Sequence, residues 1–185
     1  DEKPRPERTT SEFVNAGVYA FSPEIFAAIR HTESHGEQKL TDTLSQWLTE
    51  HRLQAVTHPG LWLDVSEPWD LLSVNEALLT DAELANEPSA TIDPTAAMAA
   101  TTRIGEGVTV HPQAAVLQGA TLGDNVRIGA GAIVENTVIL SDVTVNSSAV
   151  LTDCIVGANA TIGANTTIKG GPTDVVLNDE VYHDV

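Results

Sequence analysis

The sequence predicts a chain in two parts, an α/β segment followed by a parallel β-helix of six-residue repeats. Two observations support the β-helix: an aliphatic residue recurs every six residues with two steps of five, and the fourth position after most starts holds Ala, Val or Thr. The α/β segment follows from short apolar runs that alternate with stretches of helical periodicity. The aliphatic positions are Ile92, Met98, Ile104, Val110, Val116, Leu122, Ile128, Val134, Ile139, Val145, Leu151, Val156, Ile162 and Ile168.

The first part begins with an apolar run over Phe13–Phe21, which predicts a buried strand with one break at Ala16 and Gly17. A helix is predicted next, because Ser22 suits the cap, Pro23 the first turn, and Glu24 the positive end of the helix dipole. Its expected apolar face consists of Ile25, Phe26 and Ile29.

Three further elements complete the α/β segment. A second helix is predicted over Thr41–His51, and Leu61–Val65 is predicted to be another buried strand. After Pro68, a third helix is predicted from Trp69 to about Leu79. The second helix should turn Leu44, Trp47 and Leu48 inward. The segment is too short for a complete nucleotide-binding domain and has no glycine-rich phosphate loop.

In the second part, six residues are enough for a short strand and a corner, but not for a helix and turn. Three such blocks close one triangular coil, and stacked coils pair their strands in parallel about 4.8 Å apart. Gly, Asn and Asp between blocks suit turns with positive φ. The hexapeptide pattern resembles the left-handed parallel β-helix, an exception to the right-handed crossover rule. Its fourteen starts predict somewhat more than four coils.

The two five-residue blocks, Val134–Val138 and Leu151–Ile155, begin three blocks apart, so they should form the same corner in adjacent coils. A shortened corner stacks on another shortened corner without breaking the strand ladder. Cys154 lies in the second block, where a small buried residue is expected rather than a reactive thiol. The expected inward columns are Ile128 with Val145 and Ile162, and Val134 with Leu151.

The composition narrows the function. A net charge of −17 with only three lysines argues against nucleic acid and membrane surfaces as partners, and resembles proteins of salt-loving organisms. One cysteine excludes internal disulfides and fits a reducing cytoplasm. No apolar run has membrane-spanning length and no signal peptide is visible, so a cytoplasmic, halophilic protein is predicted.

Four segments in order resemble the sugar-1-phosphate nucleotidylyltransferases: "EKP" from Glu2, "NAGVYAF" from Asn15, "LTD" from Leu40, and "WLDVSEPWDLL" from Trp62. Their spacing is similar to the second half of that family's catalytic domain. A β-helix follows that domain in glucose-1-phosphate thymidylyltransferase-like enzymes and N-acetylglucosamine-1-phosphate uridylyltransferases. The resemblance implies that residues 1–86 are the C-terminal part of the catalytic domain, 87–175 the left-handed β-helix, and 176–185 a tail.

The resemblance also implies a reaction, in which a sugar-1-phosphate attacks a nucleoside triphosphate and pyrophosphate is released. Asp64 matches the second carboxylate for Mg²⁺; its alternative role is to cap the turn into the third helix. Lys3 matches a catalytic residue that contacts the sugar phosphate, although it could be a solvated loop lysine. Glu2 and Asn15 would bind sugar hydroxyls, and Gly17 would let the backbone approach the sugar.

Two features qualify this resemblance. Ser66, Glu67 and Pro68 stand where the family commonly has Gly-Thr-Pro, which adds a negative charge near the expected metal. The chain begins at Asp1 inside a motif, which indicates a piece of a longer enzyme. We therefore expect this chain alone to be inactive. The residues do not specify the base or the sugar.

Two other functions are compatible with the sequence. The first is a bifunctional or stand-alone acetyltransferase working through the β-helix, with His111 as the candidate base and Lys169 as a speculative anchor. His183 lies beyond the repeat. The second is a non-catalytic protein whose β-helix serves assembly or regulation. A homo-oligomer, with a trimer favoured, is expected, because Leu117 and Leu140 are apolar outward positions on an acidic surface. High salt should strengthen it by screening charge.

Overall fold

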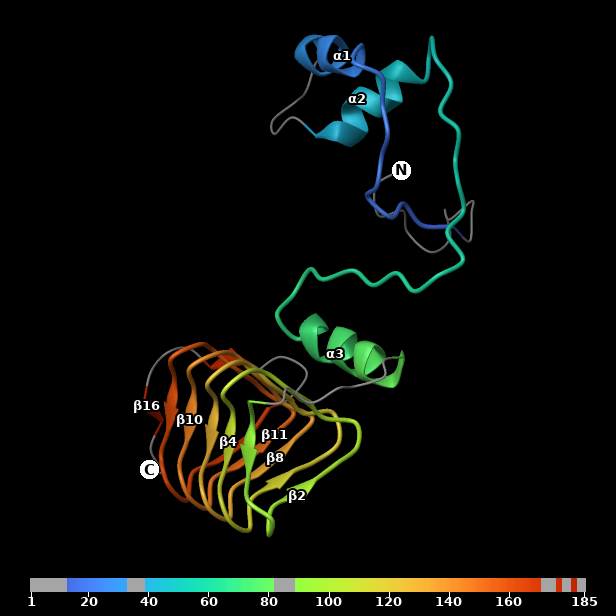
Figure 1. Ribbon diagram of the computed structural model, residues 1–185. Coiled ribbons are helices and arrows are strands. Elements are labelled where there is room, and N and C mark those ends of the chain that lie inside the picture. The colour runs from blue at the N-terminus through green and yellow to red at the C-terminus, as the bar shows by residue number, and fades with distance from the viewer. Residues whose placement is uncertain (1–12, 33–38, 82–88, 171–175, 178–180, 183–185) are drawn as a thin grey trace. The chain divides into compact units, whose positions relative to one another are not determined.

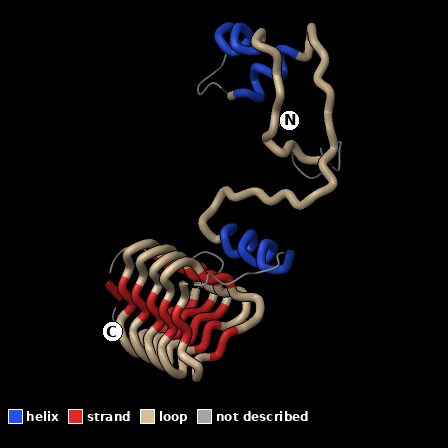
Figure 2. Tube along the Cα trace, viewed as in Figure 1, coloured by secondary structure: helices blue, strands red, loops and turns tan. Residues whose placement is uncertain are grey.

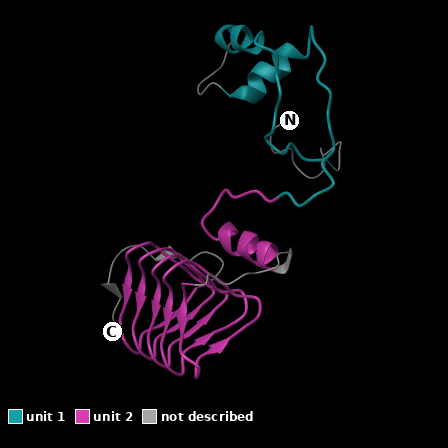
Figure 3. Cartoon of the chain, viewed as in Figure 1, with its two compact units in different colours: residues 1–62 teal, residues 63–185 magenta. Residues whose placement is uncertain are grey.

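The computed structural model describes residues 13–32, 39–81, 89–170, 176–177 and 181–182. It divides into two compact units, residues 1–62 and residues 63–185 (Figure 3). The helices are α1 (Ile25–His31), α2 (Leu40–Trp47) and α3 (Asp70–Asp81) (Figure 1). The strands are β1 (Thr91–Ile92), β2 (Ala97–Met98), β3 (Arg103–Ile104), β4 (Thr109–Val110), β5 (Ala115–Val116), β6 (Thr121–Leu122), β7 (Arg127–Ile128), β8 (Ile133–Glu135), β9 (Val138–Ile139), β10 (Thr144–Val145), β11 (Val150–Thr152), β12 (Ile155–Val156), β13 (Thr161–Ile162), β14 (Thr167–Lys169), β15 (Val176–Leu177) and β16 (Val181–Tyr182).

The strands form a three-sided parallel solenoid, which confirms the predicted repeat. Each strand pairs with the strand three later, giving sheets in the order β1-β4-β7-β10-β13-β16, β14-β11-β8-β5-β2 and β15-β12-β9-β6-β3. Figure 2 shows the stacked coils with strands on the faces and loops at the corners. The solenoid has about five turns, consistent with a left-handed β-helix. This agrees with the expectation of somewhat more than four coils. Two further strands, β15 and β16, pair with β12 and β13 after the aliphatic series ends at Ile168.

The predicted register is confirmed by the strand pairing. Val145 pairs with both Ile128 and Ile162, and Leu151 pairs with Val134. All five side chains are at most 1% exposed, so both columns point inward. Most of the small residues at the fourth positions are buried as well, because they fill the corners. The fully buried ones are Val108, Ala114, Ala120, Val126, Ala132, Val143, Ala149 and Ala160.

The two shortened blocks form the same corner in adjacent coils, as expected. Asn136 and Asp153 occupy the turn positions with φ values of 43° and 55°, and the Asn136 amide donates to the Asp153 carboxylate at 2.8 Å. Thr137 and Cys154 lie beside each other inside this corner, with Oγ1 and Sγ 3.6 Å apart. Both side chains are fully buried. The expectation of a buried structural Cys154 is therefore confirmed.

We predict that the Cys154 thiol is unreactive in the folded chain. Burial raises its pKa to about 11, with Asp153 adding to the effect and the Thr137 hydroxyl opposing it. At pH 8 only about one thiol in a thousand is then ionised, and the thiolate is the nucleophile. A disulfide reagent such as 5,5′-dithiobis(2-nitrobenzoate) should label the protein only after guanidinium unfolding. Rapid stoichiometric labelling of the native protein at pH 8 would contradict this account.

Helix α1 follows the prediction with two corrections. Helix α1 starts at Ile25, and Glu24, not Ser22, is its N-terminal boundary residue. The Ser22 hydroxyl bonds the Glu24 carboxylate instead, which holds the pKa of Glu24 below its usual value. Ile25 is buried, but Phe26, expected on the apolar face, is 62% exposed.

Helix α2 is shorter than predicted, and only part of its expected apolar face is buried. It ends at Trp47, and a turn continues to Glu50. Leu44 is buried and Trp47 half-buried, whereas Leu48 is 52% exposed. The helices α1 and α2 meet through the Thr32 hydroxyl, which donates to the Thr43 hydroxyl at 2.9 Å.

The two predicted buried strands of the first part, Phe13–Phe21 and Leu61–Val65, are wrong for this structure. Both segments run without regular secondary structure, and most of their apolar side chains are exposed. The physical reason is that a strand requires a hydrogen-bonding partner and a covering layer. No strand occurs among the described residues of the unit 1–62 that could pair with either segment. Apolar pattern alone therefore does not place them in a sheet.

Candidate functional site

The loop that carries Asp64 is ordered by a compact set of hydrogen bonds. The Ser66 hydroxyl donates to Asp64 Oδ2 at 2.7 Å. Asp70, in the first turn of α3, accepts the backbone N–H groups of Ser66 and Glu67 through Oδ2 at 2.9 and 2.8 Å. Pro68 follows in the turn that leads into the helix, where it needs no donor. The start of α3 is therefore held by Asp70, and Asp64 is not its cap.

Asp64 is a suitable single carboxylate ligand for a hard cation. It is exposed, and only one of its two oxygens has a partner among the described residues. No cluster of three or more His, Cys, Asp and Glu side chains that could hold a metal is found in the described part of the chain. Mg²⁺ does not need one, because it commonly takes one or two carboxylates together with phosphate oxygens and water.

Asn15 and Gly17 lie together in one turn of the unit 1–62. The Gly17 N–H donates to Asn15 Oδ1 at 3.0 Å, and the Asn15 amide donates to the Tyr19 hydroxyl. Gly17 has φ of +72°, which a side chain tolerates poorly, yet an added Cβ would meet nothing within 4 Å. The space above Gly17 is therefore open to a ligand.

The indole of Trp62 forms a hydrogen bond between two family-like segments that are far apart in the sequence, those beginning at Asn15 and at Trp62. Its Nε1 donates to the carbonyl of Ala16 at 3.1 Å, so the segment before Asp64 is tied to the turn that contains Asn15. Glu2 and Lys3 lie outside the described residues. Of the predicted site residues, the structure thus brings Asn15 and Gly17 into one turn and places Asp64 in the ordered loop before α3.

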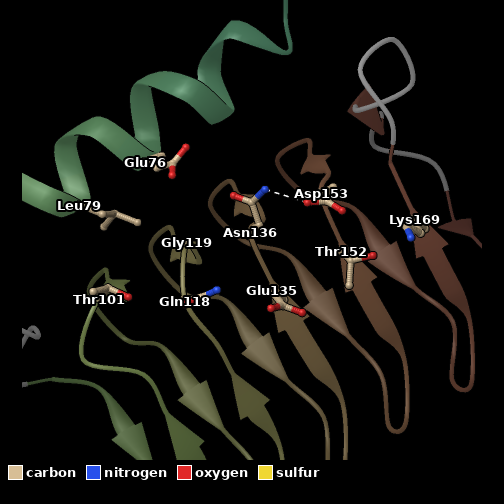
Figure 4. A pocket seen from close by; sticks show the side chains of 10 residues that line it. All are labelled: Glu76, Leu79, Thr101, Gln118, Gly119, Glu135, Asn136, Thr152, Asp153 and Lys169. Atoms are coloured by element: carbon tan, nitrogen blue, oxygen red, sulfur yellow. Dashed lines mark hydrogen bonds between the residues drawn. The ribbon is translucent and has the colours of Figure 1, made fainter.

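A separate polar cavity of about 580 Å³ lies between α3 and one corner of the solenoid (Figure 4). Successive coils line it with the same corner position, so that its wall is a column of amide, hydroxyl and carboxylate groups. Of the described residues predicted for the transferase site, Asn15, Gly17 and Asp64 do not line it. Its lining consists of Glu76, Leu79, Thr101, Gln118, Gly119, Glu135, Asn136, Thr152, Asp153 and Lys169.

The residues considered for acetyl transfer are not brought together. His111 is exposed directly after β4, and it does not line the cavity beside α3. Lys169 is exposed at the end of β14 and does line that cavity. His183 is outside the described residues. The described helices contain no segment with the length and apolar character that a membrane crossing requires.

Sequence reasoning missed three residues that organise this region: Trp62, Asp70 and Asn75. Asn75 Nδ2 donates to the Gly119 carbonyl at 2.9 Å, and the Thr121 hydroxyl donates to Asn75 Oδ1 at 2.6 Å. A signal for Asn75 existed, because it follows Leu72 by three residues and therefore interrupts the apolar face of a helix with an amide. Asp70, three residues after Glu67, has the spacing of a capping box.

Comparison with known families accounts for nearly the whole chain. Residues 1–81 match the family described as nucleotidyl transferase, and residues 98–184 match the GMPPB C-terminal domain. The boundary between these matches falls between α3 and the early coils of the solenoid.

Several curated proteins are similar to the chain. The bifunctional protein GlmU of Methanococcus maripaludis is 28% identical over 89% of this chain and 44% of its own length. That of Methanocaldococcus jannaschii is 38% identical over 40% of this chain and 19% of its own length. A probable mannose-1-phosphate guanylyltransferase 3 of Oryza sativa is 29% identical over 96% of this chain and 49% of its own length. Where the match extends over most of this chain, the chain spans about half the length of the relative.

These findings define a chain in which a segment of a nucleotidyl transferase domain is followed by a parallel β-solenoid of about five turns. The order of the two domain matches and the names of the similar proteins both indicate a sugar-1-phosphate nucleotidyltransferase. Together, the two domain matches and the similar proteins support the sugar-1-phosphate nucleotidyltransferase family.

Proposed function

We propose that the protein containing this chain makes a nucleoside-diphosphate sugar and pyrophosphate from a nucleoside triphosphate and a sugar-1-phosphate. The observation that carries the proposal is the nucleotidyl transferase match over residues 1–81, which includes every predicted site residue. Similar proteins are named as sugar-1-phosphate nucleotidylyltransferase and mannose-1-phosphate guanylyltransferase enzymes. A phosphate oxygen of the sugar-1-phosphate attacks the α-phosphorus of the nucleoside triphosphate. The bond between that phosphorus and the oxygen bridging it to the β-phosphate breaks.

Each proposed residue role follows from its chemistry and its place in the structure. Asp64 would hold Mg²⁺ through the carboxylate oxygen that Ser66 leaves free. Bound Mg²⁺ would stabilise the negative charge that gathers on the phosphates. Asn15 would bind sugar hydroxyls through its amide, which supplies both a donor and an acceptor, and Gly17 leaves room for the sugar. Glu2 would accept hydrogen bonds from sugar hydroxyls.

We predict that Lys3→Ala in the intact protein mainly raises the KM for sugar-1-phosphate. Loss of one charge-assisted hydrogen bond to a phosphate corresponds to roughly a ten- to hundredfold change. Steady-state kinetics with each substrate varied in turn would measure it. Lys39→Ala removes the same charge from the exposed start of α2 and should leave both KM values unchanged. A KM effect confined to the nucleotide would reassign Lys3.

Three further properties are part of the proposal. The protein is expected to be cytoplasmic and halophilic, on the strength of its lone cysteine and its charge of −17. A homo-oligomer, with the trimer favoured, is supported by the exposure of Leu140, which is 45% accessible on an acidic solenoid. Neither nucleic acid nor a membrane is expected as a partner. Acetyl transfer through the β-helix is not favoured by the position of exposed His111.

A further inference from the structure

Asn75 joins α3 to the solenoid through both ends of its side-chain amide. Its Nδ2 donates to the Gly119 carbonyl, and its Oδ1 accepts the Thr121 hydroxyl. Gly119 lies at a corner of the second coil, and Thr121 begins β6. Both contacts are therefore made to one three-residue stretch of the solenoid. Because an amide is planar, two bonds at its opposite ends fix both its position and its orientation. All of these groups belong to the unit 63–185.

Asn75 is a less stabilising residue than an apolar one would be on this face of α3, which points to a specific role for its amide. Leu72, Asn75 and Leu79 share one face of α3, and Leu79 is buried. An apolar residue between the two leucines would favour both the helix and the burial of area. Asn75 instead fixes the position of α3, because its hydrogen bonds are directional and are satisfied in only one register of the helix on the solenoid. Apolar contacts alone would allow the helix to shift.

The same helix begins in the loop of Asp64. Asp70 accepts the N–H groups of Ser66 and Glu67, and the Ser66 hydroxyl donates to Asp64. Residues 61–68 are exposed and have no regular secondary structure. The position of the loop therefore depends on what holds the start of α3. Only five residues, a rise of about 7.5 Å, separate Asp70 from Asn75 along the helix.

We propose that Asn75 is a positioning residue: by clamping α3 to Gly119 and Thr121, it makes the solenoid hold the Asp64 loop in place for Mg²⁺ binding. The catalytic part of this inference rests on the proposed function, because it requires Asp64 to hold the metal. The solenoid then contributes to the transferase reaction without touching substrate. Loosening the clamp weakens metal binding at Asp64 more than it lowers the rate once the metal is bound.

The test uses the intact protein with three substitutions. Asn75→Ala removes the clamp from α3, and Thr121→Val removes one of its bonds from the solenoid side with little change of shape. Ser73→Ala is the matched control, since Ser73 is exposed on the same helix. Hydrogen exchange would report on the amides of residues 63–70, and initial rates against Mg²⁺ concentration would report on the metal site.

We expect Thr121→Val to speed exchange at the Ser66 and Glu67 amides by roughly fivefold, the equivalent of one lost hydrogen bond, and Asn75→Ala, which loses two, to speed it at least as much. The Mg²⁺ concentration for half-maximal rate should rise by a similar factor, while the rate at saturating Mg²⁺ changes less than twofold. Combining Asn75→Ala with Thr121→Val should add little to Asn75→Ala alone, because Asn75→Ala already removes the bond to Thr121. Ser73→Ala should match the wild type in every measurement.

Two results would overturn the inference. One is exchange that speeds up around residue 75 while residues 63–70 stay as in the wild type. The other is faster exchange at residues 63–70 with an unchanged Mg²⁺ requirement in an active enzyme. Failure of the proposed function is distinguishable, because it would appear as a wild-type protein without transferase activity whose 63–70 exchange still responds to the clamp variants.

Discussion

Ile128→Asp should unfold the solenoid. Ile128 is fully buried in the middle coil and pairs with Val110 on one side and Val145 on the other. The substitution removes apolar contacts and places a carboxylate between two coils. The buried residues of the described chain include no Lys or Arg that could pair with this carboxylate, and Ile128 lies in a cluster of apolar side chains. The expected loss is about 4 kcal/mol or more in the free energy of unfolding.

Ile133→Asp provides a control with the same chemical change. Ile133 lies in β8 and points outward, with 37% of its side chain exposed. An outward carboxylate stays in water, so the expected loss is about 1 kcal/mol or less. Urea unfolding followed by circular dichroism would compare the two variants. Similar midpoints for both would show that the inward and outward positions have been assigned incorrectly.

Asp64→Asn should abolish most of the transferase activity of the intact protein. The amide keeps the shape and can still accept the Ser66 hydroxyl, but it lacks the charge that would hold Mg²⁺ at the reacting phosphates. We expect turnover to fall by about a hundredfold or more, which corresponds to roughly 3 kcal/mol of transition-state stabilisation. Pyrophosphate release at saturating substrates would measure the change.

The matched control for charge is Glu106→Gln, at an exposed corner of the solenoid. Glu106→Gln removes one negative charge at a position distant in sequence from the Asp64 loop, and it should leave turnover unchanged. Unfolding midpoints of both variants should equal that of the wild type, since both carboxylates are exposed. Near-normal turnover of Asp64→Asn at saturating Mg²⁺ would mean that another group holds the metal.

The solenoid was predictable because its repeat is redundant. Each inward aliphatic residue is repeated by its partners in the coils above and below, so the register of Ile128, Val145 and Ile162 follows from spacing alone. The two short blocks acted as an internal check, since they had to stack, and Asn136 and Asp153 do meet. The last two strands, β15 and β16, were not predicted, because the aliphatic period ends at Ile168.

The α/β part was less predictable, for two different reasons. The helices α1, α2 and α3 follow from local periodicity and local turns, so their approximate positions could be predicted. Apolar runs such as Phe13–Phe21 indicate a strand only if other strands are present to pair with it. Whether such pairing strands are present depends on other segments and cannot be derived from the apolar run itself. Exposure of Phe13 and Val18 is the result in this structure.

The site was predictable at the level of motifs and not at the level of contacts. Asp64, Asn15 and Gly17 were identified by resemblance, and their roles remain predictions. The contacts of Asn75 join positions 44 and 46 residues apart, and such pairs depend on how the helix lies on the solenoid. Helical spacing did mark Asn75 as an amide on an apolar face, but it did not indicate its partners.

The most direct test of the central claim follows the phosphate oxygens of the sugar-1-phosphate. The intact protein would be given Mg²⁺, a nucleoside triphosphate, and a sugar-1-phosphate whose three non-bridging phosphate oxygens are ¹⁸O, across a panel of bases and sugars. Mass spectrometry should find all three labelled oxygens in the nucleoside-diphosphate sugar and none in the pyrophosphate, because the sugar phosphate attacks the α-phosphorus. Label in pyrophosphate or orthophosphate, or no nucleoside-diphosphate sugar with any pair, would contradict the account.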